Sequence, residues 1–133
     1  MDMVKQYGPL VGRILLGIIF VVAGFGKITG FEGTVGYMHA YNLPMTQVLA
    51  VLAIIIELGG GILLIVGWKA RWAALALFAF VLIVTPIFHG FWAVPDDQKQ
   101  LQMVMFMKNL AIMGGMLYVA AFGPGSMAAE KRA

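Results

Sequence analysis

The sequence predicts an all-α integral membrane protein, an antiparallel four-helix bundle with a short interfacial helix between its first two spans. Of the 133 residues, 62% are hydrophobic and only 11% are charged, which is far from the balance of a soluble domain. Four apolar runs are each close to the ~20 residues that cross a bilayer, and spans in lipid must satisfy their backbone as helices. The runs cover residues 9–28, 44–67, 70–89 and 102–122. Only short connections separate them, so residues 1–133 are expected to form one transmembrane domain.

The first run is predicted to be a retained helix and not a signal peptide. Lys5 precedes it, but the run is too long for the apolar region of a signal peptide and no small-x-small cleavage site follows. One stripe of this helix recurs at alternating spacings of four and three residues. Its members are Arg13, Gly17, Phe20, Gly24, Lys27 and Phe31. Residues at this spacing share a helix face, and the glycines allow a partner helix to approach closely.

The connection over residues 28–43 is predicted to contain a short helix that lies across the outer mouth of the bundle. Two helical faces can be distinguished in it. Phe31, Val35 and Met38 share the apolar face, whereas Glu32, Gly36 and His39 share the other. This helix could act as a lid that carries Glu32 and His39, or it could serve packing alone.

The distribution of lysine and arginine predicts the orientation of the four spans in the membrane. They gather on one side of the membrane, at Lys5, Lys69, Arg71, Lys131 and Arg132. The other side has Lys27 at a helix end and Lys99 beside two aspartates. Because positive residues favour the cytoplasmic side, both termini are expected in the cytoplasm.

Two charged residues are predicted to lie at a similar depth in the inner half of the bundle. Counting from Pro9, Arg13 lies ~6 Å above the inner boundary, and counting from Pro44, Glu57 lies ~20 Å below the outer one. In a ~30 Å core these depths differ by only a few ångströms. Arg13 and Glu57 are therefore expected to form a buried ion pair, or Glu57 to serve as a proton site.

A second polar group is predicted in the outer half, with Glu32 nearby. Its members are Lys27, His89, Lys108 and Asn109. The fourth span can cross only if it includes Lys108, which then lies ~10 Å below the outer boundary, too deep for an unpartnered charge. These side chains are expected to line a ligand-binding cavity. Snorkelling of Lys27 and an interfacial role for His89 are the alternatives.

The sequence also limits the chemistry. It has no cysteine, which excludes disulfide exchange, thiolate metal sites and iron–sulfur clusters, and we expect no haem or zinc. Copper at Met103 and Met107 is left open, because thioethers suit Cu(I) but methionine is a routine packing residue. No metal site is predicted, and no signature of nucleic-acid binding is present.

Four stretches together resemble the DoxX family of small bacterial inner-membrane proteins. They are "RILLGIIFVVAGFGKITGF" (13–31), "LPMTQVLAVLAIIIELGGGILLIVG" (43–67), "HGFW" (89–92) and "MFMKNLAIMGGMLYVAAFGPG" (105–125). The resemblance implies a four-helix protein of the inner membrane, and it points to the same polar positions. These are Arg13, Lys27, Glu57, His89, Lys108 and Asn109.

The resemblance implies a link to redox chemistry, since the family name comes from association with a thiosulfate:quinone oxidoreductase. Lacking its own redox ligands, the chain would need a bound quinone or a partner enzyme. We therefore expect a redox membrane subunit that binds a quinone or a small anion. The alternatives are a non-catalytic scaffold for soluble oxidoreductases and a small proton-coupled transporter. Whether the chain forms homo-oligomers is left open.

Overall fold

The computed structural model describes residues 1–130, and over this range it consists of helices and their connections, as the sequence predicts. Four helical segments are long and apolar enough to cross a membrane, by length and composition. They are Asp2–Thr29, Thr46–Val66, Ala70–Ala93 and Asp96–Phe122. The first and last begin several residues before their apolar runs, and both have aspartates in the first turn. Carboxylates there offset the positive end of the helix dipole, which favours the extended helix starts.

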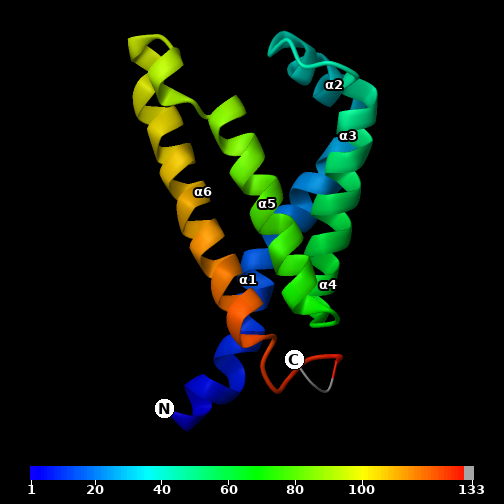
Figure 1. Ribbon diagram of the computed structural model, residues 1–133, viewed down its shortest axis with the longest axis vertical. Coiled ribbons are helices and arrows are strands. Elements are labelled where there is room, and N and C mark those ends of the chain that lie inside the picture. The colour runs from blue at the N-terminus through cyan, green and yellow to red at the C-terminus, as the bar shows by residue number, and fades with distance from the viewer. Residues whose placement is uncertain (131–133) are drawn as a thin grey trace.

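Consecutive spans run in opposite directions between two ends of the molecule (Figure 1). One end carries the N-terminus, residues 123–130 and the turn between α4 (Gly60–Val66) and α5 (Ala70–Phe88), and we call it the base. The other end carries α2 (Phe31–Ala40) and the connection from α5 to α6 (Asp96–Phe122), and we call it the mouth. That connection includes the short 3-10 helix η2 (Phe91–Ala93). The predicted helix between the first two spans is therefore present as α2.

The second span is not one continuous α-helix. It consists of α3 (Thr46–Ile54), a π-helical turn η1 (Ile55–Gly59), and α4. A π-turn inserts an extra residue into the helix and rotates the side chains that follow, and such turns are frequent at functional sites. Glu57 lies at the centre of η1 and is buried. The hydrophobic pattern of this run did not indicate the turn.

Close glycine contacts join α1 (Asp2–Thr29) to the second span. A Cβ atom added at Gly24 would lie 2.9 Å from the backbone nitrogen of Leu58, and one added at Gly17 would lie 3.0 Å from the carbonyl oxygen of Gly61. Side chains cannot fit at these distances without displacing backbone. The predicted stripe is confirmed, since Arg13, Gly17, Phe20 and Gly24 are the buried residues of α1.

The main apolar core lies where α1, α4, α5 and α6 meet. Leu64, Leu77 and Met116 are fully buried there, with Phe20 and Ala74 beside them. Towards the mouth, α5 and α6 diverge from α2 and α3 (Figure 1). A smaller core joins Met38 of α2 to Ala50 and Ala53 of α3, and Phe80 and Phe88 of α5 pack against it. The molecule thus has a packed base and two arms that separate above it.

Candidate functional site

A cavity of about 1000 Å³ lies between the two arms. Its walls come from α1, α2, α3 and η1 on one side and from α5 and α6 on the other. The polar side chains in its lining are Lys27, Thr34, Tyr37, Glu57, His89, Lys108 and Asn109. The structure therefore brings all four residues of the predicted outer group to one cavity, and it adds Glu57 to them.

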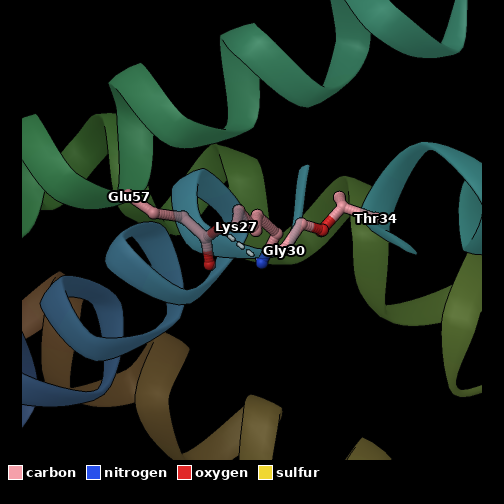
Figure 2. A network of polar contacts seen from close by, with 4 residues as sticks. All are labelled: Lys27, Gly30, Thr34 and Glu57. Carbon is pink, nitrogen blue, oxygen red and sulfur yellow. Dashed lines mark hydrogen bonds and ion pairs between the residues drawn. The ribbon is translucent and has the colours of Figure 1, made fainter. Parts of the chain in front are cut away.

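The strongest polar contact in the cavity is an ion pair between α1 and η1. Lys27 Nζ lies 2.8 Å from Glu57 Oε1, and the two side chains are 26% and 7% exposed. Figure 2 shows the lysine reaching towards the carboxylate, with Gly30 and Thr34 beside it. Thr34 donates a hydrogen bond from Oγ1 to the carbonyl of Gly30 at 3.2 Å, within the turn from α1 into α2. The π-turn and the last turn of α1 together position the pair.

The prediction that Arg13 pairs with Glu57 is wrong. Arg13 instead donates from Nη1 to the carbonyls of Leu64 and Ile65, at 3.2 and 2.8 Å, and from Nη2 to the carbonyl of Met127. The first two carbonyls belong to the last turn of α4, where the helix dipole favours a cation. Arg13 therefore fixes the base, where it joins α1, α4 and the C-terminal segment.

The error in depth has a physical cause. The count of depth placed the end of the first run and the start of the second at one outer boundary. In the structure α1 ends at Thr29, two residues after Lys27, whereas α3 begins at Thr46, eleven residues before Glu57. As a result Gly24 lies beside Leu58, and Lys27 near the end of α1 is level with Glu57. Arg13 lies farther towards the base, beside the end of α4.

The α5–α6 arm carries the other predicted residues, each with a local partner. His89 shares a hydrogen bond of 2.8 Å between Nδ1 and Gln102 Oε1. Asn109 donates from Nδ2 to Thr85 Oγ1 at 3.0 Å, and Thr85 donates in turn to the carbonyl of Val81. His89 and Asn109 thus line one cavity, and within residues 1–130 no hydrogen bond joins them to each other.

Lys108 differs from these residues because its only described polar contact is weak. Its Nζ lies 3.6 Å from Met105 Sδ, one turn earlier on the same helix. A thioether is a poor acceptor for an ammonium group. The predicted neighbours His89 and Asn109 do not bind it, so its donors are free for a ligand in the cavity.

The face of α2 that meets the cavity differs from the predicted lid. Glu32 and His39 are exposed and do not line the cavity, whereas Gly33, Thr34 and Tyr37 do. The cause is the apolar face of α2, which the sequence predicted correctly: Phe31, Val35 and Met38 pack towards α3. That packing sets the rotation of α2 and leaves Glu32 and His39 on its outer side.

Aromatic side chains join the two arms at the mouth. The rings of Tyr37 and Tyr41 lie 5.4 and 4.9 Å from the ring of Phe88, centroid to centroid. These contacts connect α2 to the end of α5, and the sequence analysis did not anticipate them. Within residues 1–130, no three His, Asp or Glu side chains group closely enough to hold a metal ion.

The cavity offers both donors and acceptors to a ligand. The Asn109 amide has its nitrogen committed to Thr85, which leaves its oxygen as an acceptor. Lys108 and the partly exposed Lys27 offer ammonium donors. Because Glu57 neutralises Lys27, Lys108 is the cation of this lining without a carboxylate partner. Such a site can hold an oxygen-bearing polar group within mostly apolar walls.

A helical membrane protein with a mostly apolar cavity, lined by a few polar side chains, is the class that this fold and site define. The sequence profile of the DoxX family matches residues 8–90, and the chain belongs to this family. It is 39% identical to "Inner membrane protein YqjF" of Escherichia coli (strain K12), over 98% of the chain and 95% of that protein. It is 34% identical to "Inner membrane protein YphA" of the same organism, over 92% of the chain and 88% of that protein.

A third relative has a name that refers to redox chemistry. "Putative oxidoreductase CatD" of Bacillus subtilis (strain 168) is 38% identical over 59% of the chain and 56% of that protein. No solved structure matches the chain. The relatives and the four apolar helices together identify a multi-pass inner-membrane protein of the DoxX family.

Proposed function

We propose that this protein is a redox-linked membrane subunit that binds a quinone or a small anion in the cavity between its arms. One observation carries the proposal: Lys108, an ammonium group without a carboxylate partner, lines an apolar cavity that Asn109 and His89 also line. The Lys108 side chain is exposed and therefore accessible to a ligand, and ammonium groups form charge-assisted hydrogen bonds to carbonyl oxygens and anions. The name of the relative "Putative oxidoreductase CatD" supports a redox-linked role.

The chain's own residues have distinct parts in this proposal. Lys108 donates to a quinone oxygen or to an anion, and Asn109 fixes the head group through its amide. Glu57 and His89 exchange protons with the cavity. A quinone supplies two-electron redox chemistry when bound, and a partner enzyme supplies or removes the electrons.

The orientation belongs to the same proposal. Lys69 lies in the turn at the base and Arg71 in the first turn of α5. The N-terminus lies at the same end (Figure 1). The positive-inside rule favours this end for the cytoplasm. The mouth then faces outward, and the cavity lies in the outer half of the bilayer.

The test compares two lysine-to-methionine variants. Quinone binding to the purified protein in nanodiscs is measured by titration for the parent, Lys108→Met and Lys99→Met. Lys99 is the matched control, since it lies on the same helix, is exposed and pairs with Asp96 at 3.3 Å. Loss of one charge-assisted hydrogen bond corresponds to ~1.5–3 kcal/mol, or roughly a tenfold to hundredfold weaker binding.

The proposal predicts that loss for Lys108→Met alone, with both variants inserting normally. Equal binding by all three proteins contradicts the quinone site. The scaffold alternative predicts a different result. In that case the protein binds neither quinones nor small anions, and it co-purifies with a soluble oxidoreductase that contacts the positively charged end of the bundle, the base.

A further inference from the structure

The lining of the cavity is divided into a polar part and an apolar part. The charged side chains and Asn109 come from the end of α1, from η1 and from α6, namely Lys27, Glu57, Lys108 and Asn109, and the other polar side chains, Thr34, Tyr37 and His89, lie near the mouth. Where α3 faces α5, the lining residues are entirely apolar. Leu49 and Leu52 of α3 lie on the first side, with Ile56 of η1 next to them, and Ala76, Ala79 and Ile83 of α5 lie on the second. A site for a small hydrophilic anion alone has no need of this second part.

The apolar part is a slot that opens towards the bilayer. α3 packs on α1, α2 and η1. α5 contacts η1 and α4, and its side chains Phe80 and Phe88 reach the core of Met38, Ala50 and Ala53. Within residues 1–130, the backbones of α3 and α5 do not contact each other. Leu52 of α3 and Ile83 of α5 line the cavity and are 47% and 62% exposed, so neither is covered by a packed neighbour there. We call this opening the α3–α5 slot.

We infer that the ligand is a single-chain amphiphile, whose polar head lies beside Lys108 and Asn109 and whose apolar chain leaves the cavity through the α3–α5 slot. The division of the lining carries this inference, because a polar head and an apolar chain match its two parts. The volume of about 1000 Å³ also exceeds what a small anion fills. Large ligand pockets of ~300–1,000 Å³ are typically apolar with a few placed polar groups.

This inference rests on the proposed function and narrows it. Of the two proposed ligands, it selects a quinone with an apolar tail and not a small anion. The ligand then enters the cavity from the bilayer. A prenylated quinone and a long-chain carboxylate share this chemistry, so the experiment includes both. The chain of either molecule occupies the same slot, whichever head is bound.

The experiment maps the position of the chain by photo-crosslinking in nanodiscs of phosphatidylethanolamine and phosphatidylglycerol. The probes are an alkyl quinone and a long-chain fatty acid, each with a diazirine in the middle of its chain. Labelled residues are identified by tandem mass spectrometry, with and without an excess of the same molecule lacking the diazirine. Val22 and Leu117, which are 65% and 48% exposed and lie outside the cavity, report labelling from bulk lipid.

A matched pair of variants tests occupancy of the slot. Ala79→Trp fills the slot, whereas Ala111→Trp adds the same bulk to an exposed alanine of α6 that does not line the cavity. We expect competitor-sensitive labelling of Leu52, Ile56 and Ile83 in the parent and in Ala111→Trp. In Ala79→Trp it should fall by about tenfold, because the added side chain overpacks the space of the chain. If Ala79→Trp does not insert into the membrane, Ala76→Trp, one turn away on the same face of α5, replaces it in the test.

The outcomes separate this inference from the proposed function. Labelling that is equal at Val22, Leu117 and the slot, or that Ala79→Trp leaves unchanged, overturns the inference. If quinone binding still depends on Lys108 in that case, the proposed function stands alone. If only the fatty acid labels the slot, the slot still binds the apolar chain of a ligand, but the quinone-linked function fails.

Discussion

Removal of either partner of the Lys27–Glu57 pair should destabilise the bundle, and the two removals should differ in size. Lys27→Met leaves the Glu57 carboxylate, which is 7% exposed, without its cation. Loss of one partner of a buried pair typically costs ~3–5 kcal/mol. Glu57→Gln leaves Lys27, which is 26% exposed and can turn towards the cavity. Its cost should therefore be smaller, about 1–3 kcal/mol.

A double-mutant cycle measures the pair directly. The free energy of unfolding is compared for the parent, both single variants and Lys27→Met with Glu57→Gln, in the same detergent. The double variant should recover part of the loss, because no unpaired charge is left in the cavity. Lys99→Met is the control, since its pair with Asp96 is exposed and should contribute only ~0–1 kcal/mol. Strictly additive single effects, or a stable Lys27→Met variant, would refute the reasoning.

Three further predictions concern packing, the base and topology. Gly24→Ala should cost ~1–3 kcal/mol, because its Cβ would press on the backbone of Leu58; Gly26→Ala, with no atom within 4 Å of an added Cβ, should be neutral or stabilising in the same thermal melts. Arg13→Met should cost ~2 kcal/mol or more and free the C-terminal segment. A cysteine introduced at Ala128 should then react faster with maleimide than the same cysteine in the parent background. Equal labelling rates would count against this role for Arg13. Lys5→Met, at an exposed position of the same helix, should leave that rate unchanged. A reporter fused to the C-terminus should give a cytoplasmic signal, and a periplasmic signal would exclude the proposed orientation.

Composition and periodicity were sufficient for the features that depend on one helix at a time. The four spans follow from run length, and the buried stripe of α1 follows from its spacing, because both are set by local geometry. The gathering of Lys27, His89, Lys108 and Asn109 at one cavity could also be predicted. Charged and amide side chains in a span have few places to lie except against a polar lining.

Partner choice between helices could not be predicted in the same way. It depends on the axial offset of α1 relative to α3 and on the π-turn at Glu57. A depth calculated from the number of residues in a straight helix includes neither effect. It therefore paired Glu57 with Arg13 and not with Lys27. The rotation of α2 likewise depends on its packing against α3, and this leaves Glu32 and His39 outside the cavity.

Native mass spectrometry of the protein released from its own membranes tests the central claim most directly. The claim is that Lys108 holds a membrane-derived ligand in the cavity. The account predicts one bound quinone-like molecule on the parent and on Lys99→Met, and its loss from Lys108→Met. A Lys108→Met protein that retains the same bound molecule, at the same occupancy as the parent, would contradict the account.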